Sequence, residues 1–191
     1  MKLTKKTLPT IIIAGLIALS GCSYDPTVDI SHAGSFDNTK NLQKYIDKGI
    51  SVNTKDEDGD TALMTATTFG HLDNIKLLLA KGANVNLKNK DGETALITLP
   101  LFDKKNDAEI LRLLLTKGAN INAQDNEGDT ALFTAVVFNR VKHVEMLLKA
   151  GANVHIKNND GDTVASFACS AEKPKEIKIL KMLTAKGVKC N

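Results

Sequence analysis

The chain has 191 residues, of which 42% are hydrophobic and 25% are charged, a composition typical of a globular protein rather than a disordered one. Trp is absent and aromatic residues make up only 4%, which predicts an aliphatic core. The net charge of +3 comes from residues 1–21, which contain three lysines and no acidic residue. The remaining 22 basic and 22 acidic side chains balance, so the charge gives no argument for nucleic-acid binding.

The N-terminal segment has the layout of a secretory signal. The three lysines precede an apolar run from Leu8 to Leu19, which is shorter than the ~20 residues that a membrane-spanning helix needs. The run ends in the sequence LSGC, with the cysteine at position 22. This tetrapeptide resembles the lipobox of bacterial lipoproteins, in which the cysteine becomes the first residue of the mature chain and carries lipid.

The resemblance implies that residues 1–21 are removed, that Cys22 is lipidated, and that residues 22–27 form a short linker. A plain cleaved signal and a short anchor helix are the alternatives. In the lipoprotein family, a serine rather than an aspartate after the cysteine implies the outer membrane. Ser23 therefore predicts a protein held by lipid on the periplasmic side of that membrane.

From residue 28 onward the sequence repeats with a period near 33 residues. Five glycines that open similar phrases, such as GANVN, are separated by 33, 36, 33 and 36 residues, and the threonines of four GDTAL-like phrases by 33, 36 and 33. Such a period indicates an array of small units that bury their apolar faces by stacking. The glycines are Gly49, Gly82, Gly118, Gly151 and Gly187, and the threonines are Thr61, Thr94, Thr130 and Thr163.

Each unit reads as a tight turn followed by two helices. Asp58-Gly59 suits a turn, and Thr61 can cap the first helix by accepting a backbone N–H. The second helix carries an aliphatic stripe that includes Ile75 and Leu78. Gly82 then suits the position just past the end of that helix.

The phrases D-x-x-G-x-T and L-L-x-x-G-A-x-V-N resemble the ankyrin repeat over nearly all of residues 28–191. This resemblance implies an all-α repeat solenoid with hairpin loops between helix pairs. We expect about five units, with atypical capping units at both ends and three-residue inserts around residues 100–107 and 169–175, each containing a proline that ends the first helix early. The units run near 28–55, 56–88, 89–124, 125–157 and 158–191.

No arrangement of residues predicts catalysis. The four histidines, at positions 32, 71, 143 and 155, lack metal-ligand spacing and are expected to be structural. The acidic run over residues 56–60 resembles a calcium loop, but Thr67 stands where the terminal Glu of an EF-hand is required. We therefore expect a non-enzymatic monomer without metal or cofactor.

The two cysteines of the last unit, Cys169 and Cys190, are candidates for a disulfide in an oxidising compartment. Each follows a different helix of an antiparallel pair, so in a regular unit they would lie at opposite ends and beyond the ~7 Å Cα limit. The alternatives are a disulfide in an altered cap, or a buried thiol at Cys169 and a free one at Cys190.

Two rows of residues are candidates for partner binding, because ankyrin arrays usually bind proteins through turn tips and first helices. The residue between Gly and Thr is acidic in all four turns, where the family tolerates many residues and architecture makes no comparable demand. A Phe stands before the turn between helices in four units. The residues are Asp60, Glu93, Asp129, Asp162, Phe36, Phe69, Phe102 and Phe138.

Together these rows would suit a partner with basic and apolar side chains. The alternative is that the Phe rings pack on each other between repeats, while the acids solvate the turns or favour helix N-termini. Bacterial proteins of similar appearance include immunity proteins against periplasm-delivered toxins, often toxins of type VI secretion, and helpers of periplasmic antioxidant enzymes. The resemblance implies a membrane-anchored binding module, with immunity favoured and a scaffold or chaperone-like helper as the alternative.

Overall fold

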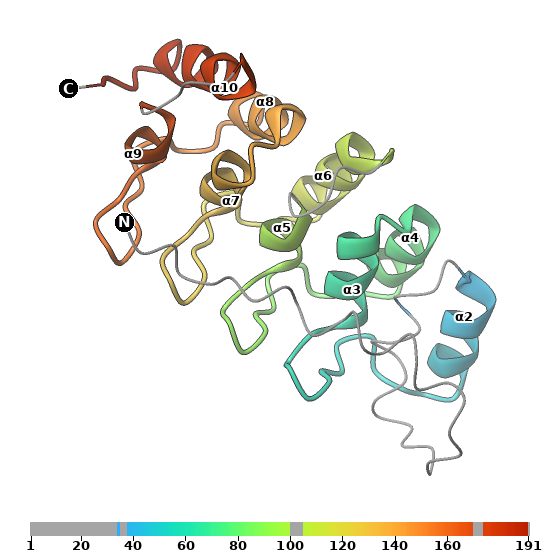
Figure 1. Cartoon of the computed structure of the whole chain (residues 1–191). Helices are drawn as coiled ribbons and strands as arrows, with labels where there is room; N and C mark the ends of the chain where they lie inside the picture. Colours follow the sequence, from blue (N-terminus) through green and yellow to red (C-terminus); the bar gives the residue numbers. More distant parts are fainter. Residues whose placement is uncertain (1–33, 35–37, 100–104, 170–173, 191) are drawn as a thin grey trace, which may run out of the picture.

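The structure is a computed structural model that describes Gly34 and residues 38–99, 105–169 and 174–190. The described part contains helices and no strands, and the helices stack in two parallel rows (Figure 1). The first helices of the units are α3 (Ala62–Phe69), α5 (Ala95–Thr98), α7 (Ala131–Val137) and α9 (Val164–Ala168). The second helices are α2 (Thr39–Asp47), α4 (Leu72–Ala80), α6 (Asp107–Thr116), α8 (Val141–Lys149) and α10 (Pro174–Thr184). This arrangement confirms the predicted all-α solenoid.

Contacts between helices run from each unit to its neighbours. Helix α3 packs against α4 of its own unit and against α5 of the next one, and α4 packs in the same way on α2 and α6. The pattern continues through α7, α8, α9 and α10. Each unit is therefore held by the units on either side of it, as stacking of incomplete units requires.

Threonines begin the first helices, as predicted. The Thr61 hydroxyl accepts the N–H of Met64 at 3.3 Å, and the Thr130 hydroxyl accepts that of Phe133 at 3.2 Å. Thr163 caps α9 through the N–H of Ala165, whereas Thr94 begins α5 without a side-chain capping bond. The hydroxyls of the three capping threonines thus satisfy donors that the first helical turn leaves unpaired.

Residues in the left-handed region end the helices. Gly82 has φ +85° after α4, and the N–H of Ala83 reaches back to the carbonyl of Leu78 at 2.9 Å. Between α7 and α8 the same conformation is adopted by Asn139, with φ 56°, where Gly70 stands between α3 and α4. Asn is among the few other residues that tolerate this region, so the turn survives the loss of glycine.

The core is aliphatic, and equivalent positions of successive units supply it. One buried row on the second helices consists of Leu78, Leu114, Leu147 and Leu183, each no more than 2% exposed. Burying one such side chain contributes about 1.5–3 kcal/mol. Phe133 and Phe167 add an edge-to-face contact between α7 and α9, with ring centroids 5.1 Å apart. Repetition of one apolar letter per unit thus produces one continuous core.

The units with inserts have short first helices. Helix α5 has four residues and α9 has five, whereas α3 has eight. Pro174 does not end a first helix, as the sequence had suggested, but begins α10, where its missing N–H would have had no partner. None of the helices in the described ranges is long and apolar enough to cross a membrane.

A disulfide joins Cys169 and Cys190, whose Cα atoms are 5.5 Å apart. Cys169 directly follows α9, and the tail after α10 returns toward that end of α9 (Figure 1). In a regular unit the two ends would be further apart, but α9 is several residues shorter than α3 and stops before it carries the chain away. The shortened helix therefore brings the two cysteines within bonding distance.

Candidate protein-binding surface

Four loops project side by side from one edge of the array (Figure 1). We call them fingers, and they comprise residues 55–60, 88–93, 124–129 and 157–162. The first and third fingers are closed at the base by β-bridges from Lys55 to Thr61 and from Gln124 to Thr130. The fingers therefore start from fixed points immediately before the first helices.

One Asp or Asn in each finger shapes its turn. In the first finger, Asp56 Oδ1 accepts the backbone N–H groups of Asp58 at 3.0 Å and of Asp60 at 2.8 Å. The same pair of bonds, to the residues two and four positions later, recurs in every finger. The accepting residues are Asp56, Asn89, Asp125 and Asn158. A short side chain with an oxygen at this distance stabilises a tight turn.

Backbone hydrogen bonds join each finger to the next. The N–H of Lys90 donates to the carbonyl of Asp58, and the N–H of Asn126 donates to that of Asp91, both at 2.9 Å. Asn159 repeats the bond to Glu127 at the same distance. The fingers thus form a regular ladder that fixes the relative positions of their backbones at the tips.

The residues between Gly and Thr, which we call the inner acidic row, take part in this ladder. Asp60 Oδ1 accepts the side-chain amide of Asn89 in the next finger at 2.8 Å, and Asp129 Oδ1 accepts that of Asn158 at 3.0 Å. Asp129 is only 6% exposed. The expectation that architecture makes no demand at this position is wrong for Asp60 and Asp129, because both bridge consecutive repeats.

The environment of Asp60 disfavours its charge. The pKa of this carboxyl is raised from 3.8 to about 6, chiefly by burial, which the hydrogen bond from Asn89 partly opposes. Repulsion from the nearby carboxylates of Asp56, Glu93 and Asp58 contributes to the rise. Asn89 also donates to Glu93 at 3.2 Å, so one amide serves two acids of this row. Glu93 and Asp162 are partly buried.

A second set of acids is exposed at the finger tips. These residues, one per finger and each immediately before the Gly, are Asp58, Asp91, Glu127 and Asp160. We call them the outer acidic row. The sequence had suggested only a turn-forming role for them, although the acid recurs there in all four copies. The repetition of that letter was the signal that could have identified this exposed row.

The structure places two of the four Phe residues of the predicted aromatic row. Phe69 is partly buried at the end of α3 and stacks on His71 of its own unit, with ring centroids 5.9 Å apart. Phe138 follows α7 and is 38% exposed. Phe36, Phe102 and Cys22 lie outside the described residues. Of the two described rings, that of Phe138 is the more exposed to a partner.

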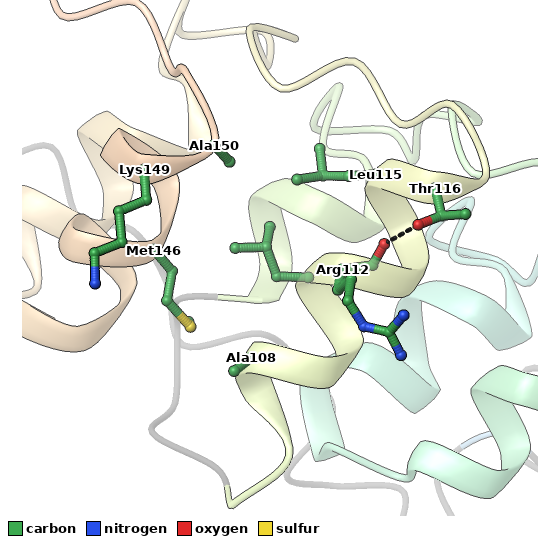
Figure 2. Close-up of a pocket in the computed structure, with 8 residues that line it drawn as sticks. Ala108, Arg112, Leu115, Thr116, Met146, Lys149 and Ala150 are labelled. Atoms are coloured by element: carbon green, nitrogen blue, oxygen red, sulfur yellow. Dashed lines mark hydrogen bonds between the residues drawn. The ribbon is translucent and has the colours of Figure 1, made fainter.

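The opposite side of the array carries open grooves between neighbouring second helices. Figure 2 shows the one between α6 and α8, where Met146 points toward the end of α6 that carries Ala108 and Leu115 lies opposite Ala150, around a volume of about 390 Å³. Arg112 and Lys149 stand at its rim. Among the described residues, no three His, Cys, Asp or Glu side chains gather as metal ligands would.

The buried histidine has a structural partner. His143 Nε2 on α8 lies 3.0 Å from Asp107 Oδ2 on α6, and both side chains are almost fully buried. The pair joins two consecutive units next to the insert around residues 100–107. This placement agrees with a structural role for His143.

Comparison with protein-family models identifies the type of repeat. The model described as ankyrin repeats in three copies matches residues 30–100 and again residues 101–191. This chain belongs to the ankyrin-repeat family. Among curated proteins, none matches this ankyrin chain. Ankyrin repeats are modules for protein–protein interaction, so the fingers and first helices of this ankyrin array form a candidate surface for a protein partner.

Proposed function

We propose that this ankyrin protein binds a basic surface of a protein partner through its outer acidic row, and that the partner is a toxin delivered into the bacterial periplasm. The observation that carries the proposal is the row itself. Asp58, Asp91, Glu127 and Asp160 are exposed on a hydrogen-bonded ladder. Because the ladder fixes these acids before binding, little conformational entropy is lost on association.

Two features support a periplasmic location. The disulfide between Cys169 and Cys190 belongs to an oxidising compartment, since cytosolic thiols are kept reduced. The sequence LSGC at residues 19–22 favours export followed by lipid attachment at Cys22. A lipid-anchored binder on the periplasmic side of the outer membrane would meet an incoming toxin before the toxin reaches its target.

An immunity role suits a protein that acts by binding, because it needs no catalysis. A rigid acidic ladder can cover the site of a toxin by forming a one-to-one complex, and such blocking needs no catalytic group. Charged rows on both partners would also speed their encounter. The matching alternative, a helper of a periplasmic enzyme, would use the same surface for a different partner.

The binding surface is tested by charge reversal. The triple variant Asp58→Lys, Asp91→Lys and Glu127→Lys should weaken partner capture from periplasm at least about tenfold. Each substitution replaces attraction between an exposed acid and the partner's basic surface with repulsion. The matched control is Asp47→Lys, Asp73→Lys and Glu145→Lys, which makes the same charge change on the second helices. Equal capture by the two folded triple variants would contradict the proposal.

The choice of partner is tested in cells. We expect the toxin to be encoded next to this protein; its expression in the periplasm should kill a strain that lacks this protein, and the wild-type protein should restore growth. The outer-row triple variant should fail to do so at equal abundance. A deletion strain that survives unharmed rules immunity out, and capture of a periplasmic stress enzyme would then support the helper role.

A further inference from the structure

Charge is divided between two sides of the array. The four fingers carry eleven acidic and four basic side chains, a net charge of −7. The basic and acidic side chains of residues 22–191 balance, so this local excess is not evident from the composition. The rest of residues 22–191 therefore carries a net charge of +7, and its positive charge lies mainly on the second helices.

The second helices and the residues that end them carry twelve exposed basic side chains. Among the side chains whose burial the structure describes, four acids accompany these on the surface, which leaves a net charge of +8 for this set. We call this set the basic helix face. Its basic members are Lys40, Lys44, Lys48, Lys76, Lys81, Arg112, Lys117, Lys142, Lys149, Lys178, Lys181 and Lys186, and its acids are Asp47, Asp73, Glu109 and Glu145.

Helix stability does not account for the excess. A lysine at the end of a helix is favoured by the helix dipole, which explains Lys81 and Lys117. Lys40 and Lys142 lie in the first turns of α2 and α8, where the dipole disfavours a cation. Two of the four acids are already paired, Glu109 with Lys76 at 2.8 Å and Glu145 with Lys149 at 2.7 Å. The positive charge is therefore larger than local folding needs require.

The two charged sides face in different directions. The second helices α4, α6, α8 and α10 lie in one row on the side of the array away from the finger tips (Figure 1). The basic helix face extends over five consecutive second helices, and its grooves, between α6 and α8 and between α2 and α4, are open and shallow. A broad surface without a deep pocket suits an extended partner better than a single side chain or peptide end.

We propose that the basic helix face rests on the anionic surface of a lipid bilayer and turns the acidic fingers away from the membrane. This inference rests on the membrane-anchored location proposed above. Anionic headgroups attract clusters of lysine and arginine, and the charges are complementary over the whole face. Ile177, 39% exposed beside Lys178 on α10, adds an apolar side chain that can enter the interface.

The orientation has a consequence for binding. A lipid at Cys22 alone would hold the array near the membrane without fixing its rotation. Contact through the basic helix face would place the outer acidic row on the side that faces the periplasm. The membrane would thereby present the proposed partner-binding surface instead of covering it.

The test uses the mature chain, residues 22–191, with Cys22→Ser to remove the lipid. Co-flotation should show at least about tenfold stronger binding to vesicles containing one third phosphatidylglycerol than to pure phosphatidylcholine. Raising the salt concentration should abolish the difference, because the Debye length shortens. Equal binding to both vesicles, or no binding to either at low salt, would overturn the inference.

Paired variants locate the contact. Lys81→Gln with Lys117→Gln should weaken binding to the anionic vesicles about 25-fold, since each lysine near the surface contributes about fivefold. Lys90→Gln with Lys157→Gln removes the same charge from the fingers and should change binding less than twofold. Equal losses in both pairs, with folding verified by circular dichroism, would refute a specific face.

These measurements are independent of the proposed partner. The Cys22→Ser chain carries no lipid and no toxin is present, so a failure here would leave the partner-binding proposal intact. Conversely, a chain that floats with anionic vesicles but protects no cell would retain the membrane contact and lose the immunity role. Binding of the basic helix face to an acidic protein, with no binding to anionic vesicles, would also overturn the inference.

Discussion

Asp60 provides a sharp prediction, because its carboxyl is held where its charge is unfavourable. Its pKa is raised from 3.8 to about 6, chiefly by burial. A folded-state pKa above the unfolded value means that folding binds a proton, so this group stabilises the fold fully below about pH 4. That stabilisation is lost as the pH rises through about 6. The shift corresponds to at most about 3 kcal/mol, and partial exposure reduces it.

The variant Asp60→Asn has nearly the same shape, cannot ionise, and can still accept the amide of Asn89 through its own Oδ1. We expect its free energy of unfolding to exceed that of the wild type by about 1–3 kcal/mol at pH 7.5. The difference should shrink as the pH falls and approach zero below about pH 4, where Asp60 becomes protonated in the unfolded state as well. An acid of the inner acidic row would thus be one whose removal stabilises the protein.

Urea unfolding followed by circular dichroism at several pH values between 4 and 8 measures the difference. Asp162→Asn changes the same position of the last finger and serves as the control, because no later finger in the described residues supplies a bridging amide. A variant that is less stable than the wild type at pH 7.5 would refute the reasoning. So would a gain in stability that does not depend on pH.

Two further predictions concern the ladder and the cap. Gly92→Ala should lower the free energy of unfolding by at least about 1 kcal/mol more than Gly82→Ala. Both glycines have positive φ, but a Cβ at Gly92 would lie 2.6 Å from the backbone N of Asn126, whereas nothing lies within 4 Å at Gly82. Equal losses of stability in the two variants would show that the contact between fingers adjusts to the new Cβ without a free-energy penalty. Cys190→Ser should destabilise the last unit by about 3 kcal/mol, since it opens the loop closed by Cys169 over a separation of 21 residues. Faster limited proteolysis within α10, with the fingers unaffected, would be the readout, and unchanged proteolysis would argue that the disulfide is dispensable.

The helical framework could be predicted because its determinants are local. Thr61 and Gly82 act on the helices to which they are adjacent, and the aliphatic stripe of α4 follows from its own spacing. A repeat of these letters is enough to specify stacking, since every unit exposes the same apolar positions to its neighbour. The disulfide depended on the length of α9, which the sequence fixes only through the packing of the whole cap.

The roles of the two acidic rows could not be assigned from one finger alone. Whether an acid faces solvent or the next repeat depends on the residue that meets it 29 positions later, as Asn89 meets Asp60. The sequence pattern contains both acids of the first finger, Asp58 and Asp60, with equal regularity. Only the register between fingers distinguishes the solvated acid from the bridging one.

The bridging amides alternate along the chain in a way that constrains how such an array can grow. The turn-forming residue is Asp at 56 and 125 but Asn at 89 and 158, so the pattern returns after 69 residues rather than after one unit. A copy of residues 56–88 placed directly after itself would set the carboxylate of Asp56 where Asn89 now donates to Asp60. Copying residues 56–124 as a block would preserve the donor. Duplicating residues 56–124 as a pair of repeats therefore keeps an amide opposite Asp60 in every copy, whereas duplicating residues 56–88 alone does not.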